Sequence, residues 1–196
     1  MKKVVIILIS LLFSGVVSAQ ENCFENCMKN FENSELDFPA RNDSILQRLI
    51  GCKLPDFETK SINGKFFSLK KLTGKVIVLN FSFAACEPCV AEVPALNKLV
   101  DEYKGKDVVF ISFSKDITEV AKGFIKKTGF KYNVITNYPN TTVTFCIIGG
   151  WPMNMVIDKK GILRFVQCGS NTDERAKTEV YDKMKPVIDK YLEDNK

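Results

Sequence analysis

Residues 76–103 read VIVLNFSFAACEPCVAEVPALNKLVDEY. The apolar run from Val76 to Phe83 predicts a buried strand, and the segment from Val90 to Tyr103 predicts a helix. Between them, Cys86-Glu87-Pro88-Cys89 places two cysteines where a small disulfide can close and open. The unpaired N–H groups and the dipole of a helix start stabilise a thiolate at Cys86. This stretch therefore predicts a redox-active dithiol, and the alternatives are a structural disulfide or half a zinc site.

The two cysteines are expected to differ in exposure and in role. We expect Cys86 to be exposed, to have a pKa below the free-thiol value of about 8.5, and to attack first. Cys89 lies one helical turn further in, so we expect it to be shielded and to resolve the mixed disulfide. Pro88 suits the first turn of a helix because it lacks an N–H, whereas the charge of Glu87 opposes thiolate formation.

The N-terminal residues predict a secretory signal peptide over residues 1–19. Lys2 and Lys3 precede an apolar segment from Val4 to Phe13, and Val17-Ser18-Ala19 fits a cleavage site before Gln20. The apolar segment is short for a membrane span, and an uncleaved N-terminal anchor is the alternative. We therefore expect an exported protein of the periplasm or cell envelope.

The composition excludes several kinds of chemistry. The 196 residues contain no histidine, which excludes a histidine triad, a histidine-ligated metal and an imidazole base. Loss of residues 1–19 lowers the formal net charge from +5 to +3, and no dense basic stripe predicts nucleic-acid binding. Seven cysteines in an exported chain indicate thiol chemistry, with no cofactor and no metal.

The rest of the pattern predicts an α/β domain over residues 51–196, after an N-terminal extension over residues 20–50. In the extension, the apolar positions Ile45, Leu46, Leu49 and Ile50 predict a short docking helix that ends at Gly51. The order of the elements in the domain corresponds to a mixed central sheet with helices on both faces and an N-terminal β-hairpin. The expected elements are a hairpin around Asn63-Gly64, a strand over 75–83, a helix over 88–104 kinked by Pro94, a parallel strand over 107–113, a helix over 117–127 before Gly129, a strand over 132–136, a loop over 137–144, a hairpin of strands 153–157 and 162–166, and a helix over 173–192 capped by Thr172.

As an ordered set, several of these features resemble the thioredoxin superfamily, and within it the TlpA/ResA-like exported thiol-disulfide oxidoreductases. The resemblance covers residues 51–196. It rests on Pro55-Asp56-Phe57 before a hairpin, GKVIVLNF at 74–81, CEPC at 86–89 with Glu92 and Pro94 after it, and Pro152 before MNMVIDKKG. It implies a thioredoxin-like fold and the reduction of disulfides in protein substrates, including apocytochrome c cysteines before haem attachment. It also implies a membrane protein that supplies the electrons.

The resemblance assigns roles to individual residues. Cys86 is the attacking thiol and Cys89 the resolving thiol, while Glu87 and Pro88 match the dipeptide of the ResA-type branch. Glu92 matches a carboxylate that this branch uses near the cysteines. Its position in the helix, three residues after Cys89, predicts a place beneath the active-site turn, where we expect it to take the proton of the resolving thiol; the alternative is a solvated helix glutamate. Asn80 stands where cytosolic thioredoxins carry a buried aspartate.

Pro152 matches the cis-proline of the family, and the alternative is an ordinary trans-proline on an edge strand. The backbone of Trp151 would then pair with an extended substrate segment by strand addition. Two residues depart from the family pattern, because Ala85 replaces the usual tryptophan and Trp151 replaces a smaller residue. Both departures concern substrate recognition.

The remaining cysteines are Cys23, Cys27, Cys52, Cys146 and Cys168, an odd number that leaves at least one unpaired or paired between chains. If Asp158 faces Gly161 in the closing hairpin, Trp151 faces Cys168 to within about one residue. Cys168 and Gly169 then lie at the same end of the sheet as Pro152, and Cys168 is either a buried apolar residue or a third redox-active thiol. A zinc site formed by the thiolates of Cys23, Cys27, Cys86 and Cys89 is a further alternative.

Three other functions compete with that of an oxidoreductase. A binding or scaffold module on the same fold is the non-enzymatic alternative, and the paired cysteines argue against it. A peroxiredoxin-like peroxidase needs a proline and threonine setting before its cysteine, which residues 80–85 lack. A copper chaperone of this fold needs CxxxC and a histidine, and the chain has neither.

Overall fold

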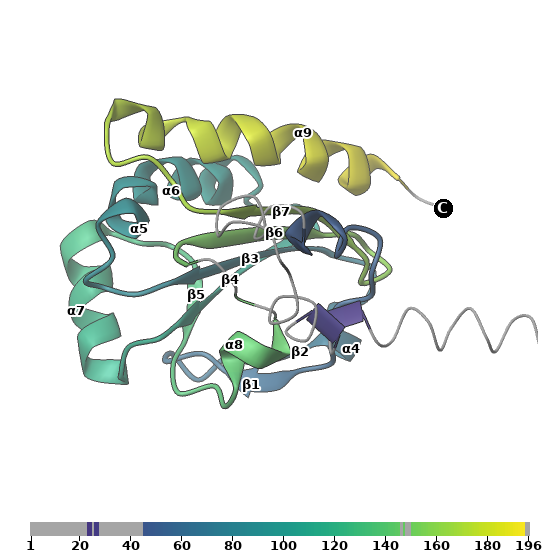
Figure 1. Cartoon of the computed structure of the whole chain (residues 1–196), viewed down its shortest axis with the longest axis horizontal. Helices are drawn as coiled ribbons and strands as arrows, with labels where there is room; N and C mark the ends of the chain where they lie inside the picture. The colour runs from purple at the N-terminus through teal and green to yellow at the C-terminus, as the bar shows by residue number, and fades with distance from the viewer. Residues whose placement is uncertain (1–22, 25, 28–44, 146, 148–149, 195–196) are drawn as a thin grey trace, which may run out of the picture.

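The computed structural model describes residues 23–24, 26–27, 45–145, 147 and 150–194 (Figure 1). The predictions for residues 1–19, for most of the extension and for Cys146 lie outside these residues. Within them, no helix is both long and apolar enough to cross a membrane. The named elements are β1 Glu58–Lys60, β2 Phe66–Ser68, α4 Leu69–Leu72, β3 Val76–Ser82, α5 Glu87–Ala91, α6 Val93–Glu102, β4 Val108–Ser114, α7 Thr118–Thr128, β5 Asn133–Ile135, α8 Thr141–Thr144, β6 Met153–Ile157, β7 Leu163–Cys168, the 3-10 helix η1 Glu174–Lys177 and α9 Glu179–Glu193.

Five strands form one mixed sheet in the order β5-β4-β3-β6-β7 (Figure 1). β3, β4 and β5 are parallel, whereas β6 and β7 each run antiparallel to their neighbours. Every residue of the central strand β3 is buried, as its unbroken apolar run predicts. Because of this topology, the ends of β3, β4 and β5 and the start of β6 meet at one edge of the sheet, which we call the redox edge.

Alternate residues of β3 serve two hydrophobic cores, one on each face of the sheet. Val76 and Val78 pack with residues of α6 and α9, whereas Ile77, Leu79 and Phe81 pack on the opposite face. Figure 1 shows α6 and α9 above the sheet and α4, α8 and the β1–β2 hairpin below it. The predicted architecture of a mixed sheet with helices on both faces is confirmed.

The helix after the cysteine pair is interrupted beside Pro94, as predicted. α5 ends at Ala91, and α6 begins at Val93 with Glu92 between them. Pro94 has no N–H to donate to the carbonyl of Val90, so the helical ladder cannot continue through this point. The interruption fixes the position of Glu92 beneath the first turn of α5.

Segments 137–144 and 173–192 differ from the predictions. Residues 141–144 form the short helix α8 instead of a loop, because the buried Phe145 anchors this turn against the rings of Phe57, Phe81 and Phe113. The last helix is divided into η1 and α9 by Thr178, whose φ of −132° is not helical. The cap of η1 is Asp173, which accepts from the N–H of Arg175, and not Thr172.

The described part of the extension belongs to the lower core. Phe24, Ile45, Leu46 and Leu49 are buried among its residues, whereas Ile50 is 41% exposed, contrary to its predicted place on the apolar side of the helix. The turns there are short, with bonds such as that from the Leu49 N–H to the Leu46 carbonyl, and three-residue turns place Ile50 outside the buried face.

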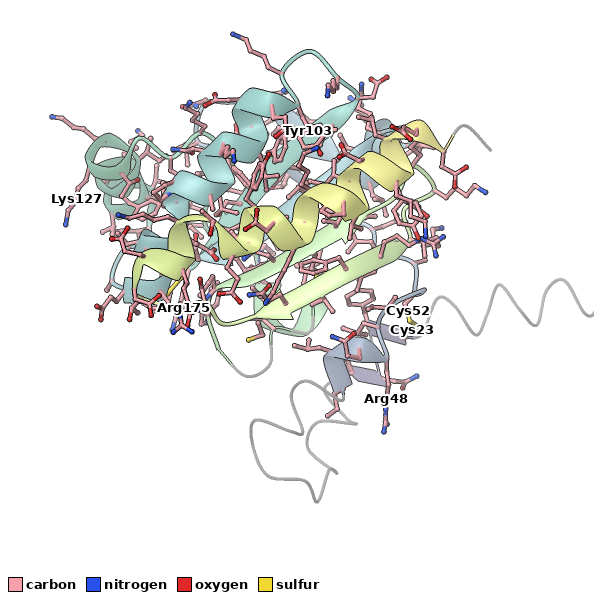
Figure 2. All side chains as sticks on the ribbon, turned by 90° about the horizontal axis from the view of Figure 1, so that it is seen from above. Cys23, Arg48, Cys52, Tyr103, Lys127 and Arg175 are labelled. Atoms are coloured by element: carbon pink, nitrogen blue, oxygen red, sulfur yellow. A yellow bond between two sulfur atoms is a disulfide. The ribbon has the colours of Figure 1, made fainter. Side chains whose placement is uncertain are left out.

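A disulfide between Cys23 and Cys52 ties the extension to the domain (Figure 2). Cys52 lies beside the start of β7, since its carbonyl accepts from the N–H of Leu163. Figures 1 and 2 place this link at the end of the sheet opposite α5. Cys27 is disulfide-bonded as well. The four-thiolate zinc alternative was therefore wrong, because the sulfur of Cys23 is bonded to Cys52.

Candidate functional site: a cysteine pair at the edge of the sheet

Cys86 and Cys89 form a disulfide across the first turn of α5, with their Cα atoms 5.2 Å apart. Cys86 is the N-cap residue, and its sulfur accepts a hydrogen bond from the backbone N–H of Cys89 at 3.3 Å. Pro88 lies in the first turn, as predicted. The pair therefore lies at the positive end of a helix, where negative charge on sulfur is stabilised.

The exposure of Cys86 was predicted wrongly. In the disulfide form Cys86 is only 6% exposed and Cys89 2% exposed, so both sulfurs are nearly covered. The bond to Cys89 and the hydrogen bond from its N–H turn the Cys86 side chain back over the helix. Ala85 and Glu87 on either side are exposed, and Cys86 is still the more accessible of the two cysteines.

Glu92 is completely buried one helical turn after Cys89, so the alternative of a solvated helix glutamate was wrong. Its carboxyl oxygens accept hydrogen bonds from Asn80 at 3.0 Å and from Asn154 at 3.2 and 3.1 Å. Burial raises the pKa of Glu92 to about 8, although these amides and the side chain of Ser170 act in the opposite direction. The group is therefore mostly a neutral acid at pH 7.

Two buried asparagines hold Glu92 from neighbouring strands. Asn80 on β3 pairs directly with Asn154 on β6, and its amide also donates to the Asn154 carbonyl oxygen at 3.0 Å. Ser112 on β4 completes the row by donating to the Asn80 carbonyl oxygen at 2.9 Å. These side chains lie on the face of the sheet that carries Val78 and Val156, which is the face covered by α6 and α9. They therefore reach Glu92, which lies between α5 and α6.

Sequence reasoning missed Asn154 and Asp116. Asn154 stands in the apolar run MNMVI, and a polar residue at a core-facing strand position was the available signal. Asp116 follows β4 and accepts from the N–H of Ala84 at 2.7 Å, which anchors the loop before Cys86. No local pattern indicated that contact, because 32 residues separate the two partners.

Trp151 and Pro152 lie at the redox edge, immediately before β6. The peptide bond between them is cis. The indole of Trp151 packs edge-on against the ring of Phe83 with 5.7 Å between centroids, and the Phe83 carbonyl accepts from the N–H of Cys86 at 3.1 Å. The single tryptophan is thus linked to the cysteine turn through one aromatic residue.

Cys168 lies near Pro152, but its strand register differs from the prediction. Asp158 bonds to Ile162 rather than facing Gly161, and a bulge follows at Val156/Ile157, so Cys168 pairs with Met153 and not with Trp151. Its thiol donates to the carbonyl of Gly150 at 3.4 Å, and the Gly169 N–H donates to the carbonyl of Pro152 at 2.7 Å. Burial raises the pKa of Cys168, which disfavours the thiolate that a third redox-active cysteine needs.

The described residues contain no cluster of histidine, cysteine, aspartate or glutamate arranged to hold a metal ion. What they do contain is a dithiol-forming pair at a helix start, a buried acid beneath it and a cis-proline loop beside it. A mixed sheet that carries these groups at the ends of its parallel strands defines a thioredoxin-like thiol-disulfide oxidoreductase.

Comparisons with known proteins agree with this class. A sequence model of the AhpC/TSA family matches residues 50–166. The thiol-disulfide oxidoreductase ResA of Bacillus cereus is 35% identical over 127 residues, which cover 64% of this chain and 73% of ResA. The thioredoxin-like protein YneN of Bacillus subtilis is 29% identical over 126 residues, with 62% and 73% covered. The chain therefore belongs to the AhpC/TSA family and, within it, to the ResA-type thiol-disulfide oxidoreductases.

Solved structures show the same fold. A thiol:disulfide interchange protein of the thioredoxin family from Chlorobium tepidum superposes with a TM-score of 0.59 at 24% identity, covering 71% of this chain and 95% of its own. A thiol:disulfide interchange protein from Bacteroides sp. gives a TM-score of 0.58 at 22% identity, covering 71% and 90%.

Proposed function

We propose that Cys86 and Cys89 are the redox-active pair and that the enzyme reduces disulfides in exported proteins. The Cys86 thiolate attacks one sulfur of the substrate disulfide, forms a mixed disulfide and releases the first substrate thiolate. The Cys89 thiolate then attacks the Cys86 sulfur and releases the second substrate thiolate. Two electrons pass to the substrate, and the Cys86–Cys89 disulfide forms. The observation that carries the proposal is the position of the Cys86–Cys89 disulfide at the start of α5.

Glu92 is proposed to take the proton that Cys89 must lose, through the ionised fraction of its carboxyl, which is the minority at pH 7 and grows as the pH rises to about 8. Its pKa of about 8 is close to that of an ordinary thiol, so proton transfer between the two is nearly balanced in free energy. The position one turn below Cys89 and the complete burial of the carboxyl support this role. Pro152 and the backbone of Trp151 are proposed to hold the substrate segment beside Cys86.

The direction and the partners are part of the same proposal. The resemblance to ResA-type proteins supports reduction, with apocytochrome c cysteines as a substrate and a membrane dithiol protein as the electron donor. A reduction potential near or below the −270 mV or so of thioredoxin supports this direction, whereas a value near about −120 mV identifies an oxidant. Equilibration of the pair with a dithiol buffer measures this potential.

Insulin reduction tests the proposal directly. Wild type is expected to reduce insulin and Cys86→Ser is not, while Glu92→Gln is expected to slow the reaction about tenfold at pH 7. Glu119→Gln on α7 is the matched control, because this carboxylate is exposed and lies on another helix. Equal turnover by wild type and Cys86→Ser would favour a binding module, and consumption of hydrogen peroxide without insulin reduction would favour a peroxidase.

Export is proposed from residues 1–19, with the mature chain beginning at Gln20. Mass spectrometry of the protein purified from the cell envelope tests this. An N-terminus at Gln20 is the expected result, and an intact Met1 would indicate the uncleaved anchor instead.

A further inference from the structure

A pocket of about 420 Å³ opens at the redox edge beside Trp151. Lys115 follows the end of β4, residues 137–141 follow the end of β5, and Trp151 precedes β6. The lining residues that bear on its chemistry are Lys115, Asn137, Tyr138, Asn140 and Trp151. We call this the Trp151 pocket.

Phe83 connects the Trp151 pocket to the cysteine turn. The Trp151 indole packs on the Phe83 ring, and the Lys115 ammonium lies 5.6 Å from the centroid of the same ring. The backbone N–H of Lys115 donates to the Ser82 carbonyl at 3.1 Å, and the Phe83 carbonyl accepts from Cys86. A chain that places its disulfide against Cys86 therefore passes close to this pocket.

The lining of the Trp151 pocket offers positive charge and hydrogen-bond donors. Lys115 is its charged residue, and no carboxylate is among the described lining residues. Asn137 and Asn140 are exposed and adopt the left-handed backbone conformation, and their side-chain amides make no hydrogen bond within the described part of the chain. The neighbouring Asp116 is not among the lining residues, and its carboxylate accepts hydrogen bonds from the Ala84 N–H and the Ser114 hydroxyl. Such a lining complements a carboxylate.

We propose that the Trp151 pocket receives an acidic side chain of the protein substrate, close to the disulfide that Cys86 attacks. This inference rests on the proposed function and names the substrate feature that the enzyme selects. Lys115 supplies the complementary charge, and the free amides of Asn137 and Asn140 supply donors. Trp151, which replaces the smaller residue of the family pattern, forms the wall shared with the cysteine turn.

Three synthetic peptides test the inference. They share one sequence with an internal disulfide and differ only in carrying Glu, Gln or Lys two residues from a cysteine. The second-order rate constant for oxidation of the pre-reduced enzyme is measured with each peptide. For wild type we expect the order Glu, Gln, Lys, with steps of about threefold, as suits an exposed ion pair that salt weakens.

Substitutions at Lys115 provide the decisive comparison. Lys115→Gln is expected to remove the preference, and Lys115→Glu to invert it, so that the Lys peptide becomes the fastest. A gain of rate with that peptide cannot result from misfolding. Lys127→Gln is the matched control, since it removes the same charge from α7, where Figure 2 shows Lys127 projecting away from the body of the protein; it should keep the wild-type order.

The possible failures are distinguishable. If wild type reduces all three peptides equally, or if Lys115→Glu keeps the wild-type order, the acidic subsite is refuted and the oxidoreductase proposal stands. If wild type reduces none of the peptides and no insulin, both proposals are refuted.

Discussion

Asn154 donates its side-chain amide to both carboxyl oxygens of Glu92, at 3.2 Å and 3.1 Å, from the strand that follows the cis-proline. The proposed substrate-binding loop therefore leads directly into β6. Asn154, which donates hydrogen bonds to the buried Glu92, follows Pro152 by two residues. β6 therefore joins the residues proposed to hold the substrate to the amide that holds Glu92. This gives the chain a short physical connection between substrate contact and the acidity below Cys89.

The buried acid predicts an unusual dependence of stability on pH. Between the ordinary pKa of 4.5 and the folded pKa of about 8, the folded oxidised protein keeps a proton that the unfolded chain releases. Stability is therefore fully present below pH 4.5 and is lost as the pH rises to 8, by about 4 kcal/mol. Urea unfolding of the oxidised protein at pH 5 to 8 measures this slope.

Glu92→Gln should flatten that slope, because the amide does not titrate. The other titratable groups that affect Glu92 are Glu179, whose pKa is lowered, and Tyr132, whose pKa is raised well above 10, so neither titrates in this window. Equal slopes in wild type and Glu92→Gln would contradict a raised pKa.

Replacement of Asn154 should be costly. Asn154→Leu leaves a buried carboxyl with fewer donors and removes one of the two acceptors of the Asn80 amide, and we expect a loss of about 2–3 kcal/mol. Chemical denaturation of the oxidised protein measures it. In a Glu92→Leu background only the bond between Asn80 and Asn154 remains to be lost, so the same substitution should cost less, and an equal cost in both backgrounds would show that Asn154 acts independently of Glu92.

The single tryptophan should report the redox state of the cysteine pair. Reduction breaks the bond between the Cys86 and Cys89 sulfurs. The backbone N–H of Cys86 donates to the Phe83 carbonyl, and the Phe83 ring packs against the Trp151 indole. We expect a change in tryptophan emission on reduction, measured at constant pH in folded protein. The Cys86→Ser/Cys89→Ser double variant should show no change under the same conditions, and identical wild-type spectra would contradict the coupling.

Loss of the Cys23–Cys52 disulfide should lower stability without affecting catalysis. The bond joins residues 29 positions apart, and opening it gives the unfolded chain more freedom, so Cys23→Ser/Cys52→Ser should lose about 2–4 kcal/mol. Thermal unfolding and insulin reduction measure the two properties separately. A large loss of activity at a temperature where the variant is folded would contradict the separation between the two ends of the sheet.

Local sequence signals predicted the elements that position the site. The unbroken apolar run of β3, the proline that interrupts the helix at Glu92 and the glycine that ends α7 each act within a few residues, so the sequence pattern contains the cause. The cysteine pair is equally local, since helix geometry alone brings Cys86 and Cys89 together.

Features that depend on distant residues were missed or wrong. The contact of Asn154 with Glu92 joins residues 62 positions apart, and α8 forms because Phe145 finds a buried place among other aromatic rings. The strand register at Cys168 depends on one extra turn residue and a bulge, which no propensity identifies. The low exposure of Cys86 was observed in the disulfide form, and the sequence pattern does not specify the oxidation state.

This thiol-disulfide oxidoreductase has a second disulfide that joins two parts of its own fold. The Cys23–Cys52 link is remote from the first turn of α5, and Cys52 is only 5% exposed. Because of this burial and distance, we expect the Cys23–Cys52 disulfide to stay oxidised while the proposed redox pair is reduced and oxidised in turn.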